Sequence, residues 1–116
     1  MNKNRIITGV VILLVLILGL TIVKLKGSNE RNVEIDVVAE CIGQASELYV
    51  QLGCVHCETQ KEMFGKSYSK LNIVDCYYQR DLCLEKGIEA TPTWIIGNNS
   101  YRGIQSIEKL KELTNC

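Results

Sequence analysis

Six cysteines constrain this chain of 116 residues more than any other feature, and all of them follow residue 40. Such a density of cysteines is unusual in a reducing cytosol and common in compartments where disulfides persist. The length allows one small domain. The cysteines therefore predict a single compact domain that is exported from the cytoplasm and cross-linked by disulfides.

An uncharged stretch of 18 residues, 6–23, precedes this domain, and 14 of its residues are apolar. As a helix it would span about 27 Å, close to the thickness of the hydrocarbon core of a bilayer. We expect residues 1–26 to form an N-terminal membrane anchor and residues 27–31 a polar linker. A cleaved signal peptide is the alternative, although its apolar region is normally shorter and ends at a small-x-small site, which this stretch lacks.

The charges around the apolar stretch decide its orientation only weakly, because basic residues flank both ends: Lys3, Arg5, Lys24 and Lys26. The cysteines favour a single-pass protein whose domain lies outside the cytoplasm, in a periplasm or at the extracellular face. Residues 27–116 hold nine basic and thirteen acidic residues, a net charge of −4. An acidic domain without a basic run argues against binding of nucleic acid. Because the core is small, we also expect no cofactor.

Hydrophobic periodicity predicts the element order α-β-α-β-α-β-β-α for the domain, residues 32–116. We expect an amphipathic helix over 32–45, and short strands over 47–52, 71–76, 93–96 and 101–103. Two helices are expected over 58–66 and 81–86, and a last one after Ser106, whose hydroxyl suits a helix N-cap. The pattern indicates an α/β domain.

The motif Cys54-Val55-His56-Cys57 lies between an expected strand and an expected helix. Cys54 would lie at the helix N-terminus, where free backbone N–H groups and the helix dipole stabilise a thiolate. Cys57 would face the same side, within disulfide reach and better shielded from solvent. We therefore expect Cys54 to be the attacking sulfur and Cys57 the resolving one. His56 can hydrogen-bond to the Cys54 thiolate, or pair with it when protonated, which would make the disulfide a stronger oxidant.

Two other interpretations of this motif remain open. Cys54 and Cys57 could form half of a zinc site, with Cys76 and Cys83 as the other half. Their spacing is wide for a zinc knuckle, and an oxidising compartment disfavours free thiolates, so we expect no metal. The Cys54–Cys57 pair could also be a purely structural disulfide, although so small a ring stabilises a fold little.

Pro92 is the only proline of the chain and directly precedes an expected strand. Lone prolines usually mark loops, but after a strand–CxxC–helix unit we expect the Thr91–Pro92 bond to be cis and to face the cysteines. Proline has no N–H and can lie against the sulfurs, while the backbone of Thr91 can pair with an extended substrate peptide. Trp94 is expected in the core, with a substrate contact as the alternative.

Together these residues resemble the thioredoxin superfamily, and more narrowly the thioredoxin-like domain associated with bacterial and archaeal homologues of vitamin K epoxide reductase. The resemblance covers residues 38–116 and rests on the stretches 48–49, 54–57, 60–65, 74–76, 83, 86–88, 92–94, 101–106 and 115–116. It implies a thioredoxin-like fold, a small central mixed sheet flanked by helices. It also implies an extracytoplasmic disulfide oxidoreductase that passes electrons to a quinone-reducing membrane partner, here a separate protein. The family usually has Trp before the CxxC, Pro within it and Tyr before the cis-proline, where this chain has Gly53, Val55 and Thr91.

The four remaining cysteines can pair in three ways once Cys54–Cys57 is fixed. Cys76 closes an expected strand and Cys83 lies in the following helix, so we expect a local bridge between them. Cys41 and Cys116 would then join the two ends of the domain. The entropy model gives about 2.5 kcal/mol for the short loop and about 4.5 kcal/mol for the long one. Alternatively, one of these pairs shuttles electrons between Cys54–Cys57 and the membrane partner.

The sequence thus predicts a membrane-anchored thiol–disulfide oxidoreductase that oxidises client thiols through the Cys54–Cys57 disulfide. A client thiol would attack Cys54, and Cys57 or the client's second thiol would resolve the mixed disulfide. A disulfide reductase or isomerase is an alternative with the same chemistry. A non-enzymatic zinc-binding or disulfide-stapled interaction module is the alternative of a different class.

Overall fold

The computed structural model describes residues 2–116 and divides the chain into two compact units, Met1–Val33 and Glu34–Cys116. Helix α1, Lys3–Ala45, begins in the first unit and ends in the second. A window of 18 residues within it has a mean hydropathy of 3.1 and no buried residue, so this helix is long and apolar enough to cross a membrane. The segment expected as a linker, 27–31, is helical, because it contains no proline and ends in the good helix formers Glu30 and Arg31.

The second unit contains a four-stranded mixed sheet with the strand order β2-β1-β3-β4. Its strands are β1 (Ser46–Val50), β2 (Ile73–Asp75), β3 (Thr93–Ile96) and β4 (Asn99–Arg102). Strands β1 and β2 are parallel, and β3 is antiparallel to both β1 and β4. The helices are α2 (Val55–Phe64), the 3₁₀ helix η1 (Gly65–Lys70), α3 (Arg80–Glu85) and α4 (Ile107–Thr114). The domain is therefore a mixed α/β domain, as the sequence predicts.

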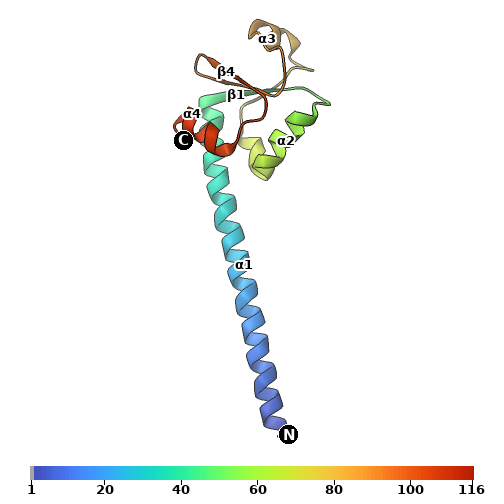
Figure 1. Ribbon diagram of the computed structural model, residues 1–116, viewed down its shortest axis with the longest axis vertical. Helices are drawn as coiled ribbons and strands as arrows, with labels where there is room; N and C mark the ends of the chain where they lie inside the picture. The colour runs from blue at the N-terminus through green and yellow to red at the C-terminus, as the bar shows by residue number, and fades with distance from the viewer. Residues whose placement is uncertain (1) are drawn as a thin grey trace. The chain divides into compact units, whose positions relative to one another are not determined.

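Helices cover both faces of this sheet, with α3 on the opposite side from α2 and α4 (Figure 1). The alternation of side chains along β1 explains the two layers, since Leu48 and Val50 join one apolar cluster and Tyr49 joins the other. The larger cluster includes residues from the end of α1, from α2, from β3 and from α4. The smaller one packs α3 against β1 and β2 through Cys83, Tyr49 and Val74.

The end of α1 approaches the chain between η1 and β2 very closely. A Cβ atom at Gly43 would overlap the backbone carbonyl oxygen of Lys70 and lie 3.0 Å from the Cα atom of Leu71. Only glycine fits this contact without movement of the backbone. Gly43 therefore brings the end of α1 against the domain's own sheet and helices.

Most elements lie within a few residues of their expected bounds, and strand β3 has the bounds expected for it. Strand β4 begins at Asn99, two residues before the expected start, because the turn needs only Gly97 and Asn98. The 3₁₀ helix η1 was not expected. It begins at Gly65, whose positive φ of 54° ends α2 and lets the chain tighten before β2.

Candidate active site

The turn between β1 and α2 positions the two cysteines of the CxxC motif. Strand β1 ends at Val50, and the backbone N–H of Cys54 donates to the carbonyl oxygen of Gln51 at 3.1 Å. Gly53 has a φ of 81°, a conformation that favours glycine, so the chain reverses here into α2. Cys54 is the N-cap of α2, and its Sγ atom accepts the backbone N–H of Cys57 at 3.2 Å.

Cys54 and Cys57 form a disulfide with a Cα–Cα distance of 5.2 Å. Cys54 is partly exposed, whereas the Cys57 residue is 4% exposed and belongs to the larger apolar cluster. A nucleophile from solvent therefore reaches Cys54 more easily than Cys57. A thiolate at Cys54 would keep the N–H of Cys57 and the N-terminus of α2 as stabilising partners.

The loop before β3 brings Thr91 and Pro92 beside this disulfide. Strands β1 and β3 are antiparallel with Tyr49 opposite Thr93, so the end of one strand lies next to the beginning of the other. The Thr91–Pro92 peptide bond is cis, as expected, and the Sγ atom of Cys54 lies 3.5 Å from the carbonyl oxygen of Thr91. The hydroxyl of Thr93 donates to the carbonyl oxygen of Ala90 at 2.7 Å, which closes this turn.

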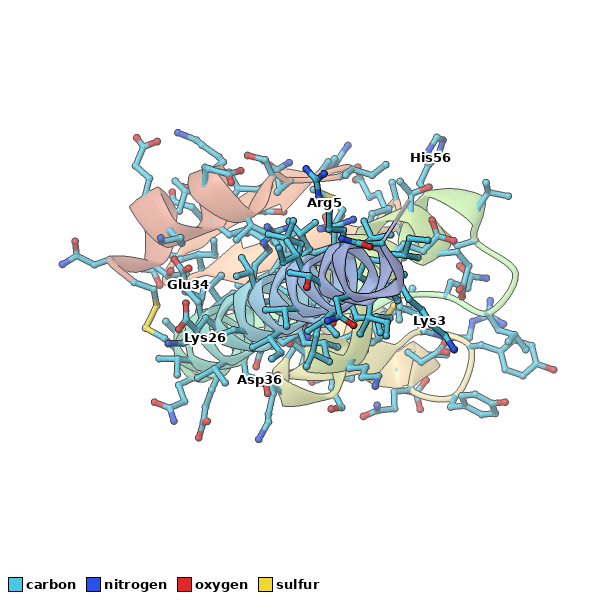
Figure 2. All side chains as sticks on the ribbon, turned by 90° about the horizontal axis from the view of Figure 1, so that it is seen from below. Lys3, Arg5, Lys26, Glu34, Asp36 and His56 are labelled. Carbon is cyan, nitrogen blue, oxygen red and sulfur yellow. A yellow bond between two sulfur atoms is a disulfide. The ribbon has the colours of Figure 1, made fainter. Side chains whose placement is uncertain are left out.

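His56 lies in the first turn of α2, where its side chain is exposed and points outward (Figure 2). The imidazole of His56 is thus open to solvent, although His56 stands between the two cysteines in the sequence. Glu58, also in the first turn, is held near Lys61, with 3.7 Å between the carboxylate and the ammonium group. This pairing reduces the repulsion that the Glu58 charge would exert on a thiolate at the start of the helix.

Gln60 is the residue of this site that the sequence analysis did not identify. It is fully buried, and its Nε2 donates to the carbonyl oxygen of Gln105 at 3.0 Å. Its Oε1 accepts the indole N–H of Trp94 at 3.1 Å and the backbone N–H of Gln105 at 2.8 Å. Gln60 thereby joins α2 to β3 and to the loop after β4. The available signal was its helical spacing from Cys57 and Phe64, which places an uncharged polar residue on a buried face.

The loop after β4 also contacts the proline turn directly. The backbone N–H of Gly103 donates to the carbonyl oxygen of Pro92 at 2.8 Å. Trp94, two residues after the proline, is 0% exposed and packs in the larger apolar cluster, as expected for a core residue. A continuous set of hydrogen bonds therefore runs from α2 through Gln60 and the 103–105 loop to Pro92.

The other cysteines lie in two further disulfides, Cys41–Cys116 and Cys76–Cys83, which are the pairs expected. Each cysteine of the chain is thus in a disulfide, and the zinc hypothesis has no thiolate set in this state. Within residues 2–116 no group of three or more His, Cys, Asp or Glu side chains is placed to hold a metal ion.

The comparisons with known proteins point to one class of enzyme. No family model matches the chain. A curated protein, Thiol-disulfide oxidoreductase LTO1 of Arabidopsis thaliana, is 36% identical over 78 residues, which cover 60% of this chain. This chain spans 21% of that relative's length. The similarity supports a relationship to thiol–disulfide oxidoreductases, at partial coverage.

Proposed function

We propose that this chain is a thiol–disulfide oxidoreductase with a thioredoxin-like domain, and that it oxidises thiols of client proteins. The observation that carries the proposal is the Cys54–Cys57 disulfide, with Cys54 as the N-cap of α2 and its sulfur accepting the N–H of Cys57. A four-stranded mixed sheet with helices on both faces fits the thioredoxin-like fold. The name of the relative, a thiol–disulfide oxidoreductase, supports the same chemistry.

The different exposures of Cys54 and Cys57 support their roles in this mechanism. A client thiolate attacks the partly exposed Cys54 sulfur, so that a client–Cys54 bond forms and the Cys54–Cys57 bond breaks. The electron pair of the broken bond leaves with Cys57. A second client thiolate then attacks the client sulfur, and Cys54 leaves as a thiolate stabilised by the N–H of Cys57. The client becomes a disulfide and the enzyme a dithiol.

The turn at Thr91 and Pro92 offers a place for the client backbone. Its carbonyl oxygen at Thr91 lies 3.5 Å from the Cys54 sulfur, so a peptide paired along this turn would bring its own cysteine close to Cys54. The hydrogen bond from Gly103 to Pro92 holds the turn against the loop after β4. We assign the Thr91–Pro92 turn the task of orienting the client.

We further propose that the domain works outside the cytoplasm, anchored by residues 6–23, and is reoxidised by a quinone-linked membrane enzyme similar to vitamin K epoxide reductase. The apolar α1 supports an anchor. The pairing of all six cysteines supports an oxidising compartment. A membrane anchor would keep the domain near a membrane-bound oxidant. The redox state of Cys54 in intact cells tests the direction of electron flow, and a mostly reduced Cys54 would favour a reductase instead.

Trapping of mixed disulfides tests the assignment of the two cysteines. The full chain in detergent micelles is mixed with a peptide that contains one disulfide, and adducts are counted by mass spectrometry. Cys57→Ala should accumulate a peptide adduct on Cys54, because the resolving sulfur is gone, and Cys54→Ala should accumulate none. Adducts with Cys54→Ala alone would reverse the roles. The proposed function is wrong if two results are obtained together: the wild-type protein does not oxidise a dithiol peptide, and the Cys57→Ala variant forms no peptide adduct.

A further inference from the structure

A cavity of about 280 Å³ borders the resolving cysteine, away from the turn of Thr91 and Pro92. The side chains that matter in its lining are those of Cys57, Glu58, Lys61, Tyr68 and Asp75. A water molecule occupies about 30 Å³ in the liquid, so this space can hold several waters. Four residues with titratable groups thus share a wettable space with the buried sulfur of the active site.

Cys57 has a chemical need for such a space. At 4% exposure, the sulfur of this residue is released as an anion within the larger apolar cluster whenever a client attacks Cys54. A thiolate in surroundings of low polarity is costly, so Cys57 has to gain a proton in this step. In the reverse step, closure of the disulfide, the Cys57 thiol has to lose that proton before it can act as a nucleophile.

Tyr68 is a half-buried residue that lines this cavity and has no role in the thiol–disulfide exchange itself. It comes from η1 and packs against the cluster that contains Cys57. Burial raises the pKa of Tyr68, and the charges of Glu58 and Asp75 raise it further, so its hydroxyl keeps its proton at neutral pH. The Lys61 ammonium lies 5.8 Å from the centre of the Tyr68 ring and also pairs with Glu58.

We propose that Tyr68 relays the proton of Cys57, through water in this cavity, to the carboxylates of Glu58 and Asp75. The proposal rests on the proposed function. In the closing step, the Cys57 proton passes through water to the Tyr68 oxygen while the Tyr68 proton passes to a carboxylate. The Cys57 thiolate then attacks the Cys54 sulfur of a mixed disulfide, the Cys54–Cys57 bond forms, and the client sulfur leaves with the electron pair of the broken bond. In the opening step the proton returns to Cys57.

A two-step chromogenic reaction separates the two cysteines. The full chain in detergent micelles, reduced only at Cys54–Cys57, is mixed with a chromogenic aromatic disulfide in a stopped-flow instrument. Attack by Cys54 releases one coloured thiol, and attack by Cys57 on the mixed disulfide releases a second. Tyr68→Phe should slow the second release at least about tenfold near pH 7 and make its rate proportional to the hydroxide concentration, while the first release changes less than about twofold. Tyr101→Phe, at another partly buried tyrosine packed on the same cluster, is the matched control and should change neither release.

A second variant distinguishes a relay from a simple charge effect. If Glu58 and Asp75 act only through their charge, Glu58→Gln with Asp75→Asn should favour the Cys57 thiolate and accelerate the second release. The relay predicts the opposite, a slower second release with Tyr68 still in place, and this variant decides the matter if Tyr68→Phe does not fold. A wild-type rate for the second release in either variant, or an accelerated one in the carboxylate variant, overturns the relay and leaves the proposed function intact. A wild-type protein that releases no second thiol contradicts the proposed function itself.

Discussion

We expect the stability of the site to depend strongly on the buried side chain of Gln60. Replacement of Gln60 by leucine keeps the size of the side chain and removes its polar atoms. The indole N–H of Trp94 and the backbone N–H and carbonyl of Gln105 then lose their partners. Each buried group left without a partner costs about 1–3 kcal/mol.

The loss of a hydrogen-bond partner does not cost the same for the Trp94 N–H as for the two backbone groups of Gln105. Trp94 is 0% exposed, so its N–H has no access to water and carries the full cost, whereas Gln105 is partly exposed and its backbone can be hydrated. We therefore expect Gln60→Leu to lower the free energy of unfolding by about 2–4 kcal/mol. The loop of residues 103–105 would also hold Pro92 less firmly, since Gly103 donates to the Pro92 carbonyl.

Urea unfolding of the full chain in detergent micelles measures this loss, and the fluorescence of Trp94, the only tryptophan, reports it. Gln44→Leu is the matched control, because Gln44 is an exposed glutamine near the end of α1. The control should lie within about 0.5 kcal/mol of the wild type. If Gln60→Leu is as stable as Gln44→Leu at an equal m-value, the hydrogen bonds of Gln60 do not stabilise the site.

Three further predictions concern other parts of the domain. Gly43→Ala should destabilise the domain by about 1–3 kcal/mol, because the new Cβ atom meets the backbone of Lys70. The control Gln44→Ala should leave the stability unchanged, and equal urea midpoints for the two variants would contradict the close contact. His56→Ala should make the Cys54–Cys57 disulfide less oxidising, because the Cys54 thiolate loses its interaction with the exposed imidazole. An interaction of about 0.5–1 kcal/mol corresponds to a change of about 10–20 mV in the reduction potential. A glutathione titration that gives an unchanged or more oxidising potential would reject this role of His56. Stepwise reduction with thiol counting should free two thiols first, at Cys54 and Cys57, and four more only near unfolding; early release of Cys41 or Cys116 would favour the electron shuttle.

Local sequence signals were sufficient for much of the fold. The strand Thr93–Ile96 follows a proline and precedes a Gly-Asn turn, and both of its ends are therefore marked. The hydroxyl of Ser106 accepts the N–H of Lys109 at 3.1 Å, as its expected role as an N-cap requires. The segment 27–31 lacks such marks, and its polar composition fits a linker and a solvated helix equally well. The 3₁₀ helix η1 has no hydrophobic periodicity of its own, since its two short turns, Gly65–Lys70, are too few to show a repeated spacing.

The parts of the site that lie within one short motif could be predicted from the sequence. The contacts between segments far apart in the chain were harder to predict. A CxxC at the start of a helix sets the Cys54–Cys57 pair by itself. The contact between Cys54 and Thr91, 37 residues apart, needs the antiparallel pairing of β1 and β3, which the sequence pattern alone does not specify. The roles of Gln60 and Tyr68 were not predicted, because a polar residue within a helix normally faces solvent. The helical spacing of Gln60 from Cys57 and Phe64 indicates a buried face, but only the structure shows that Gln60 bonds to Trp94 and that Tyr68 packs against the larger apolar cluster.

The layers of the domain also bear on how the three disulfides divide their work. Cys54 and Cys57 belong to the cluster on the side of α2, while Cys76 and Cys83 belong to the cluster on the side of α3, with strand β1 between them. The two pairs thus pack in different apolar clusters, although the backbone N–H of Cys76 donates to the carbonyl oxygen of Val50, at the end of the strand that leads to the active site, at 2.8 Å. Cys116 packs against the same apolar cluster as Cys57, so Cys41–Cys116 is the outer pair on the same side of the sheet as the active site. The Cys76–Cys83 disulfide joins α3 to the residue that follows β2, and we expect it to act as a structural staple rather than as part of a shuttle, because it links elements that otherwise meet through the smaller apolar cluster.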